Sequence, residues 1–527
     1  MQLKNYKWLL VFALLIAACA PPATTLTDTQ IMSTDAQVEP SAATNTLRIA
    51  TPFLSTPMDP IQGGSFYTVQ WGFGETLLRL DATFQPVPWL AEQLTPLDET
   101  QWEIKLRAGV TFHDGAPMDA TAVKASLERA VENNATAKQL LDAQAITVVD
   151  DLTLIITTNT PNLRMPGVLT EPTTVILNAA AALAQGDEQF GLKPIMTGPF
   201  AVVETVIGQS VKLRRYDRYW GGAAKLDAIE IVVLADADAR MLALQSGEAD
   251  IAADIRPESV TVAEADPNLN VVLASPVATI FMYINQHKPI WQDPKLRQVL
   301  AYATPDRNAL VKTVLRDQGI PGLGPIPPTI LACDNLQATP PDLEKAKQLL
   351  AEAGYVDSDG DGVVEKDGQP LALIAISYPQ RASLTPTSEI IQANLQEIGI
   401  GMEIRSVENI DATLKEADWD IGMYFNNMAA TGDPYGPLAN FYTKDGAANR
   451  GGYLNAAVEA QIAELRDIPA LDQRRAKACE ISQALLDDTA IVPLFYPFYP
   501  YGVSTQVAGF TEAHPYFLYF LNNTISK

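Results

Sequence analysis

His113 and Asp114 are neighbouring residues whose types could support acid–base chemistry in this 527-residue chain. They stand in the stretch 111–115, however, where Asp-Gly follows an alternating strand pattern and is typical of a tight turn. His287 and His514 are isolated in the sequence. The chain contains no His-Glu-x-x-His, Cys-x-x-Cys, phosphate-binding Gly-Lys-Ser/Thr or Gly-x-Ser-x-Gly motif. We therefore expect a structural role for His113, no catalytic residue, no cofactor and no enzymatic activity.

A second chemical candidate is Asp357-Ser358-Asp359-Gly360-Asp361-Gly362, which is similar to the start of a calcium-binding loop. Such a loop has carboxylates at positions 1, 3 and 5 and glycine at position 6, but it also needs a bidentate glutamate at position 12. The twelfth residue here is Gly368. The same composition is typical of a solvated hairpin tip, which is the interpretation we favour. We predict no metal centre, although the sequence leaves calcium open.

The N-terminal segment predicts a secreted, lipid-anchored protein. Lys4 and Lys7 precede an apolar run over 8–18, which is shorter than the ~20 residues that cross a membrane and resembles a secretory signal. Because Cys19 follows small residues directly, we expect 1–18 to be a lipoprotein signal peptide and Cys19 the lipidation site. The Thr-, Ala- and Ser-rich stretch 19–45 then serves as a lipidated flexible tether. The predicted location is the extracytoplasmic face of the cell membrane, and an ordinary secreted protein with a chance cysteine is the alternative.

The composition is that of a globular protein with an acidic surface, since 47% of residues are hydrophobic and the net charge is −25. Such a charge disfavours nucleic acid as a partner. Cys333 and Cys479 could pair in an oxidising exterior, but the sequence gives no distance between them. We expect them to be unpaired and the protein to be a monomer.

Short strands alternate with helices along the remaining 480 or so residues, which are enough for two or three domains. Alternating or apolar runs predict strands over 102–106, 152–157, 211–213 and 229–233. An apolar stripe predicts a helix over 342–353 that ends at Gly354, and a second helix is predicted over 389–397, before Gly399. This alternation indicates an α/β fold with mixed sheets.

Several short motifs occur in a single order along most of the chain. They lie at 74–80, 88–92, 106–115, 119–129, 197–200, 219–221, 244–251, 294–307, 346–354 and 432–434. In this order they resemble the family 5 extracellular substrate-binding proteins of ABC importers, the peptide and nickel binders. The resemblance implies a two-lobed, periplasmic-binding-protein-like clamshell of type II with an extra subdomain in lobe I. Lobe I would comprise 46–275 with a C-terminal return at 498–527, and lobe II would comprise 276–497.

The resemblance also implies which residues hold a ligand. Asp433 occupies the position that pairs with the ligand's ammonium group in dipeptide-binding relatives, and a buried cation needs such a counter-charge. A helix N-terminal cap is the alternative for Asp433, because Asp-Pro commonly opens helices. Arg381 resembles a position that holds a ligand carboxylate, with an exposed loop arginine as the alternative.

Four further residues complete the predicted ligand site. Asn427 lies in a stretch, 425–431, that looks like the nickel or opine-metallophore branch, and Tyr435 follows Asp-Pro where a histidine can stand. Tyr67 and Asn285 are polar groups near predicted strand ends, although such residues are more often core than site. The Arg-Pro of some nickel-binding relatives is replaced by Glu171-Pro172.

The resulting expectation is a membrane-anchored receptor that captures peptides or peptide-like solutes and passes them to the permease subunits of an ABC importer. A nickel or metal-chelate receptor of the same family is one alternative. A sensor lipoprotein that does not serve transport is the other.

Overall fold

The computed structural model describes residues 45–416, 418–428, 431–510, 519 and 521–527. Residues 43–527 form one unit, to which the following description applies. The predicted signal peptide, Cys19, nearly all of the tether and His514 lie outside the described residues. Among the described residues, none of the helices combines the length and the apolar character that crossing a bilayer requires.

The first of two large sheets has seven strands and is mixed, because β1 runs parallel to β10 and β11 while β21 runs antiparallel to β11. Ile229 and Ile231 alternate with more exposed residues along β10, as a strand with one core-facing side requires. In spatial order the strands are β12 (Leu269–Ala274), β21 (Tyr499–Ser504), β11 (Ile251–Ala252), β1 (Thr46–Thr51), β10 (Ala228–Val233), β9 (Ser210–Arg215) and β8 (Phe200–Val206).

The second large sheet has six strands and is also mixed, since β17 runs parallel to both β18 and β19 while β13 runs antiparallel to β19 and β20. Every residue of β13 and β20 is buried, so these central strands are covered on both faces. In spatial order the strands are β14 (Gly319–Pro321), β20 (Ile491–Pro497), β13 (Ala278–Ile284), β19 (Ile421–Asn427), β17 (Ala372–Ser377) and β18 (Gly401–Ser406).

The chain passes between these two sheets twice. It leaves the seven-stranded sheet at the end of β12 and enters the six-stranded sheet at β13, after three intervening residues. It returns from β20 to β21 through Phe498 alone. The last described residue then closes onto the first strand, because the Lys527 Nζ donates to the Thr46 carbonyl oxygen and pairs with Asp250.

A third, four-stranded antiparallel sheet builds a separate core with α2 (Ala120–Asn133). Trp102 and Ile104 from its strand β5 are buried together with Val123 and Leu127 of the helix. Its strands, in spatial order, are β4 (Ala91–Pro96), β5 (Gln101–Leu106), β7 (Thr153–Thr158) and β6 (Ala143–Asp150). Two hairpins complete the strands, β2 (Leu78–Leu80) with β3 (Pro86–Pro88), and β15 (Glu365–Lys366) with β16 (Gln369–Pro370).

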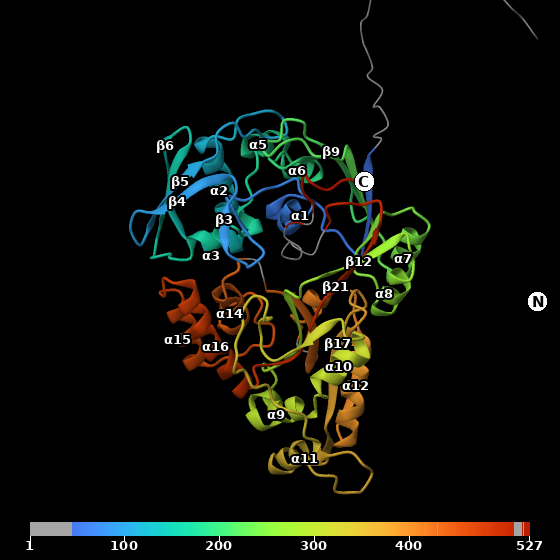
Figure 1. Cartoon of the computed structure of the whole chain (residues 1–527). Coiled ribbons are helices and arrows are strands. Elements are labelled where there is room, and N and C mark those ends of the chain that lie inside the picture. The colour runs from blue at the N-terminus through green and yellow to red at the C-terminus, as the bar shows by residue number, and fades with distance from the viewer. Residues whose placement is uncertain (1–44, 417, 429–430, 511–518, 520) are drawn as a thin grey trace, which may run out of the picture. The chain divides into compact units, whose positions relative to one another are not determined.

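Helices cover the sheets, and those from α9 to α12 and from α14 to α16 gather around the six-stranded sheet (Figure 1). Besides α2, the α-helices are α1 (Ser65–Gln70), α3 (Ala135–Leu141), α4 (Met165–Val168), α5 (Ala179–Gln185), α6 (Asp187–Leu192), α7 (Ala237–Gln245), α8 (Pro257–Glu264), α9 (Pro294–Ala303), α10 (Arg307–Val314), α11 (Leu343–Glu352), α12 (Leu384–Glu397), α13 (Ile410–Thr413), α14 (Tyr435–Tyr442), α15 (Ala456–Leu465) and α16 (Leu471–Asp487). Three 3₁₀ turns are η1 (Pro60–Gln62), η2 (Pro172–Thr174) and η3 (Pro289–Gln292).

The predicted elements are confirmed, with one boundary displaced. The four predicted strands correspond to β5, β7, β9 and β10, and the helix predicted over 342–353 is α11, which Asp342 caps by accepting from the Lys345 backbone N–H. Helix α12 begins at Leu384 rather than at 389. Pro386 conceals this start in the sequence, but proline is tolerated in a first turn because its missing N–H has no intrahelical partner there.

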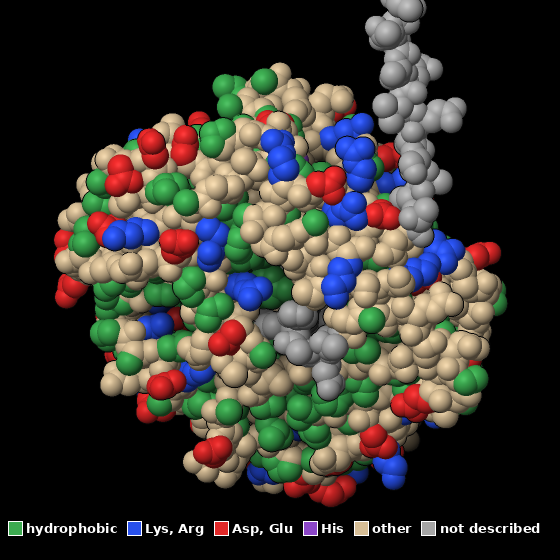
Figure 2. Space-filling model, turned by 45° about the horizontal axis from the view of Figure 1, so that its top comes forward, with side chains coloured by type: hydrophobic (Ala, Val, Ile, Leu, Met, Phe, Trp, Pro, Cys, Tyr) green, Lys and Arg blue, Asp and Glu red, His purple; other side chains and the backbone are tan. Residues whose placement is uncertain are grey.

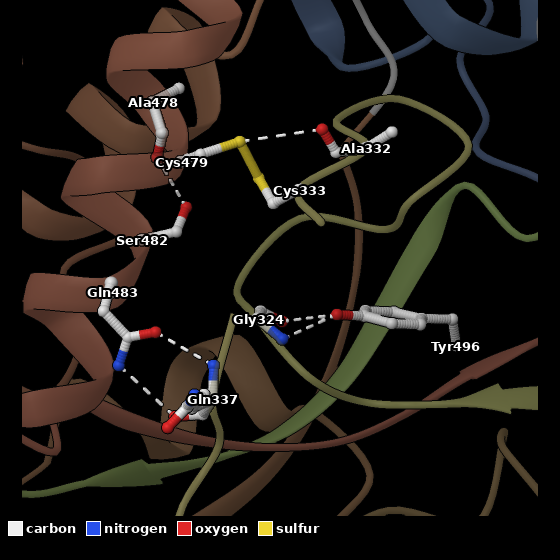
Figure 3. Close-up of a disulfide and its surroundings, with 9 residues drawn as sticks. All are labelled: Gly324, Ala332, Cys333, Gln337, Ala478, Cys479, Ser482, Gln483 and Tyr496. Atoms are coloured by element: carbon white, nitrogen blue, oxygen red, sulfur yellow. Dashed lines mark hydrogen bonds between the residues drawn. A yellow bond between two sulfur atoms is a disulfide. The ribbon is translucent and has the colours of Figure 1, made fainter. Parts of the chain in front are cut away.

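The expectation that Cys333 and Cys479 are unpaired is wrong, because they form a disulfide (Figure 3). Their Cα atoms are 5.6 Å apart, within the usual range for a bridge. The bridge joins the segment after α10 to α16, where Gln337 and Gln483 also exchange hydrogen bonds between the same two segments. The cysteines are 146 positions apart in the sequence, so the sequence alone did not indicate that they lie close together.

Candidate functional site

Arg381 lies in the loop between β17 and α12 and reaches from the six-stranded sheet toward the seven-stranded sheet. Its Nη1 donates to Oδ2 of Asp254, which follows β11, over 2.8 Å. Only 10% of the arginine side chain is exposed. Asp254 is itself held in place, because its backbone carbonyl oxygen accepts a hydrogen bond from Nη2 of Arg240. A predicted ligand-binding arginine therefore forms an ion pair that connects the two sheets.

Aromatic side chains surround this arginine. Its guanidinium carbon lies 3.8 Å from the ring centroid of Phe425 and 5.3 Å from that of Phe53. Phe53 makes an edge contact with Tyr67 of α1, so the structure brings Tyr67 and Arg381 into one cluster. Burial raises the pKa of Tyr67, and Arg381 opposes this rise. Stacked aromatic faces stabilise a desolvated guanidinium by about 0.5 to 2 kcal/mol.

Two cavities meet at Arg381. One has a volume of about 120 Å³ and is bordered by the β20–β21 crossing, including Phe498 and Tyr499. The other is wider and more open, at about 390 Å³, and is bordered by Phe53 and Tyr424. Arg381 and Phe425 line both of them. On the face of the molecule in Figure 2, hydrophobic and basic side chains border a central hollow, and charges of both signs are interspersed around it.

Asp433 lies between β19 and α14 and is already engaged. Its Oδ2 accepts from the Arg474 Nε over 2.8 Å, and its Oδ1 accepts from the Tyr435 backbone N–H at the start of α14. The side chains of Asp433 and Arg474 are 7% and 6% exposed. The helix-start contact considered as the alternative for Asp433 is therefore present, and it coexists with a buried ion pair.

Tyr435 faces a buried arginine that the sequence did not single out. The guanidinium carbon of Arg164 lies 3.9 Å from the centroid of the Tyr435 ring. Arg164 directly precedes α4, whose residues Met165 and Val168 belong to the core of the four-stranded sheet, whereas Tyr435 begins α14. Burial lowers the pKa of Arg164, and Asp433 counters this only in part.

The two predicted asparagines lie at opposite ends of one strand pair. Asn427 ends β19 opposite Ala278, next to the first crossing. Asn285 follows the other end of β13, about 20 Å away at the usual rise per residue. It is 1% exposed and donates to the Trp419 carbonyl. The structure therefore does not bring Asn285 together with the other predicted ligand residues.

Two buried carboxylic acids stand out by their electrostatics. Burial raises the pKa of Glu75 to about 7, even though Thr197, Trp220 and Tyr219 hydrogen-bond to it. Burial also raises the pKa of Glu171 to about 7, opposed only by a backbone hydrogen bond from Thr173. The sequence placed Glu75 in the 74–80 motif and Glu171 where some nickel-binding relatives have an arginine, but neither position indicates burial.

The remaining chemical candidates are His113 and the aspartates at 357, 359 and 361, and all of them form hydrogen bonds with backbone groups. Both ring nitrogens of His113 are hydrogen-bonded to the backbone. Its Nδ1 accepts from the Met196 N–H, and its Nε2 then donates to the Gly198 carbonyl. Burial lowers its pKa to about 4. The exposed Asp357, Asp359 and Asp361 have oxygens within 4.8 Å of one another and accept backbone N–H groups of their own loop. The turn and calcium interpretations both stay predictions.

Comparisons with known proteins agree with this architecture. Residues 85–449 match the family model described as bacterial extracellular solute-binding proteins, family 5 middle. The glutathione-binding protein GsiB of Salmonella paratyphi A is 30% identical over 411 residues, which cover 73% of this chain and 78% of GsiB.

Two solved structures have the same fold. Staphylococcus aureus NikA, in complex with Ni(L-His)2, has a TM-score of 0.82 at 24% identity, covering 92% of this chain and 99% of that one. The Bacillus subtilis oligopeptide-binding protein AppA, in complex with a nonapeptide, has a TM-score of 0.78 at 21% identity, with coverages of 92% and 99%. The expected α/β fold with mixed sheets is thus confirmed.

Proposed function

Because the chain belongs to family 5 of the bacterial extracellular solute-binding proteins, we propose that it captures peptides or peptide-like solutes outside the cytoplasm and delivers them to the permease of an ABC importer. The family binds solutes and is not a family of enzymes. One observation carries the proposal: charged side chains of both signs are buried among aromatic rings where the two large sheets meet. A solute with its own charged groups and an apolar body suits such surroundings.

In this proposal Arg381 binds a ligand carboxylate by exchanging it for Asp254. The planar guanidinium can keep its stacking on Phe425 during that exchange. Asp433, Asn427, Tyr435 and Tyr67 contribute polar groups around the ligand. Asn285 is left out because its side chain is engaged in the core, beyond the other end of β13.

We also propose that Cys19 carries the lipid that holds the mature protein at the extracytoplasmic face of the membrane. A lipid anchor and a flexible tether would keep the receptor at a high local concentration near its permease. Metabolic labelling with a fatty acid, followed by membrane fractionation of the wild type and Cys19→Ala, tests this. Label and membrane association should both disappear in the variant, and a variant that keeps both contradicts the anchor.

A metal chelate is the second candidate ligand. The histidines at 113 and 287 are unsuited to direct ligation, since the first is bonded to the backbone and the second is exposed beyond β13. A chelator that presents carboxylates could instead be held by arginines, so this candidate uses the same charged groups.

The two candidates separate in a binding experiment on protein purified without refolding. Native mass spectrometry would first identify any co-purified ligand. Thermal-shift titrations would then compare glutathione, free tripeptides and nickel–histidine, and 100 times the dissociation constant should stabilise the protein by about 2.7 kcal/mol.

Variants connect the best ligand to the proposed contacts. Arg381→Gln and Asp433→Asn should each weaken its binding. Arg405→Gln serves as the matched control, because Arg405 on β18 is partly exposed and pairs with Glu403 and Asp418. If both site variants bind as tightly as the control, the site assignment is wrong.

A further inference from the structure

The wider of the two cavities beside Arg381 combines aromatic rings with carboxylates. Its volume is about 390 Å³, and its walls include Phe53, Tyr378, Tyr424 and Phe425. The function proposed above gives Arg381 a ligand carboxylate to bind and leaves the rest of this cavity without an assigned chemical group. The rings and charges of its walls indicate which group fits there.

The cavity lies at the carboxyl ends of two parallel strands. Tyr378 directly follows β17, and Glu408 lies two residues beyond β18, which runs parallel to β17. Asp411 belongs to α13, the next helix along the chain. Phe53 lies two residues beyond β1 and enters from the seven-stranded sheet. Open α/β sheets bind ligands outside this edge, so the cavity has the position of a ligand site and walls from both large sheets.

The aromatic wall already holds one cation. The guanidinium carbon of Arg381 lies 3.8 Å from the ring centroid of Phe425 and 5.3 Å from that of Phe53. Its charge is matched on the side of the narrower cavity, because Asp254 Oδ2 accepts from its Nη1 over 2.8 Å. Arg381 therefore does not leave the wider cavity with a surplus of positive charge.

Two carboxylates line the same cavity and differ in how they are matched. Oδ1 of Asp411 accepts from the Tyr424 hydroxyl over 2.9 Å and from Nη2 of Arg450 over 3.0 Å. Glu408 is exposed and forms no ion pair with any residue in the described part of the chain. Its one link to the opposite wall is through the backbone, since its carbonyl accepts from Gln380.

The charges of this region leave a single negative surplus on Glu408. Arg381 is paired with Asp254, and Arg450 is paired with Asp411. An unmatched carboxylate beside aromatic rings attracts a cation, because a ring presents a negative face and the carboxylate supplies the counter-charge.

The surroundings of Glu408 suit an organic cation better than a metal ion. A metal site needs several ligating side chains close together, and hard cations need six or more oxygen atoms. Among the described residues, the aspartates at 357, 359 and 361 are the one group of three or more acidic, histidine or cysteine side chains whose ligand atoms are that close. Glu408 and Asp411 do not belong to such a group, whereas the rings beside them favour an alkyl stem that ends in a positive charge.

We infer that the wider cavity binds a guanidinium or alkylammonium group of the solute, with Glu408 as its counter-charge and the rings of Tyr378 and Tyr424 beside its stem. The inference rests on the proposed function and narrows its substrate class to solutes with a cationic side chain. Arg381 lines the same cavity, so one residue of a solute can place its carboxylate on Arg381 and its side chain near Glu408.

The first test uses two small probes that contain no peptide. n-Butylguanidinium and n-butylurea have the same stem and nearly the same shape, but only the first is charged. In saturation-transfer NMR titrations of the full chain, the wild type should bind the cation about tenfold or more tightly than the urea, since a charged hydrogen bond is gained. Glu408→Gln should lose most of this preference.

Glu403→Gln is the matched control for these titrations. Glu403 is another exposed glutamate, on β18, but it pairs with Arg405 and lies outside the cavity, so its variant should keep the preference of the wild type. Glu408 is exposed and bonded through its backbone alone, so Glu408→Gln should fold normally. A wild type without the preference, or a Glu408→Gln variant that keeps it, overturns the inference.

The second test compares the tripeptides Ala-Ala-Lys and Ala-Ala-norleucine by isothermal titration calorimetry. Their last side chains have similar stems and differ in charge. The wild type should bind the lysine peptide about tenfold or more tightly, and Glu408→Gln should reduce this ratio while Glu403→Gln keeps it. Equal affinity of the wild type for both peptides contradicts the inference.

The two tests separate the inference from the proposed function. A wild type that binds neither tripeptide nor glutathione counts against peptide capture, and the cation site is then decided by the butyl probes. A wild type that binds both tripeptides but does not prefer butylguanidinium to butylurea keeps the proposed function and overturns the cation site.

Discussion

The guanidinium of Arg381 and the carboxylate of Asp254 form an ion pair across the space between the six-stranded and seven-stranded sheets, with a donor–acceptor distance of 2.8 Å. In a protein whose chain crosses twice between these sheets, such a contact favours the arrangement in which they are close. In the function proposed above, a ligand carboxylate that binds Arg381 has to replace Asp254.

Asp254→Asn should loosen that arrangement. The amide can still accept a hydrogen bond but has no charge, so we expect the contact to weaken by about 1 to 3 kcal/mol. Small-angle X-ray scattering of the unliganded variant should give a larger radius of gyration than that of the wild type. Glu258→Gln is the control, because its bridge to Arg316 is exposed and contributes little. An unchanged radius for Asp254→Asn contradicts the prediction.

Asp433→Ala should destabilise the fold strongly, because it leaves the Arg474 guanidinium buried without its partner. Breaking a buried pair in this way costs about 3 to 5 kcal/mol, and urea unfolding of the variant and the wild type would measure the loss. Replacing both partners with apolar residues, as in Asp433→Leu with Arg474→Met, should restore much of the loss. A double variant no more stable than the single one would show that the ion pair is not the cause.

Removing the disulfide should lower stability. The bridge closes a loop of 146 residues, and a loop of that size is expected to contribute up to about 5 kcal/mol through the unfolded chain, with 2 to 4 kcal/mol typical. Dithiothreitol should lower the thermal unfolding midpoint of the wild type. The variant with both Cys333→Ser and Cys479→Ser should unfold at the lower midpoint with or without reductant. Insensitivity of the wild type to reductant, with the bond verified as reduced, contradicts the prediction.

The pH dependence of stability should reveal the raised pKa of the buried Glu171. Its pKa is raised from 4.5 to about 7, so between these values the folded state keeps a proton that the unfolded state has released. Its contribution to stability therefore falls as pH rises through this window and stays low above it. Between pH 5 and pH 8, the free energy of unfolding of Glu171→Gln should rise by about 3 kcal/mol relative to that of the wild type.

The comparison with the variant is needed because His113 acts in the opposite direction. Its pKa is lowered from 6.5 to about 4, so stability rises with pH between those values. His113 is present in both proteins, and its effect cancels in the difference. A difference between wild type and Glu171→Gln that does not change with pH contradicts a raised pKa.

Local pattern was enough to predict many elements of the fold. Trp102, Ile104 and Leu106 alternate with polar residues in the sequence, and all three are buried in β5. The apolar stripe of α11, with Asp342 before it and Gly354 after it, defined that helix to within a residue. Such signals are local, since they depend on residues that are near each other in the chain.

The site was less predictable because its contacts are not local. Cys333 and Cys479 meet only through the packing of α16. Asp433 and Arg381 were identified by resemblance, but their partners Arg474 and Asp254 are 41 and 127 residues away in the sequence. Glu171 was noted in the sequence only as the residue that replaces the arginine of an Arg-Pro pair, and Arg164 was not noted at all. Their burial is seen only in the folded structure.

The contact of Lys527 with Thr46 places the last described residue beside the first strand. A short linker between these positions would therefore allow circular permutation with little change in the fold. New ends could then be opened in an exposed loop such as the one between β15 and β16, and a fluorescent protein inserted there would report on movement of the six-stranded sheet. The closeness of Thr46 and Lys527 makes the unit formed by residues 43–527 a practical scaffold for a solute biosensor.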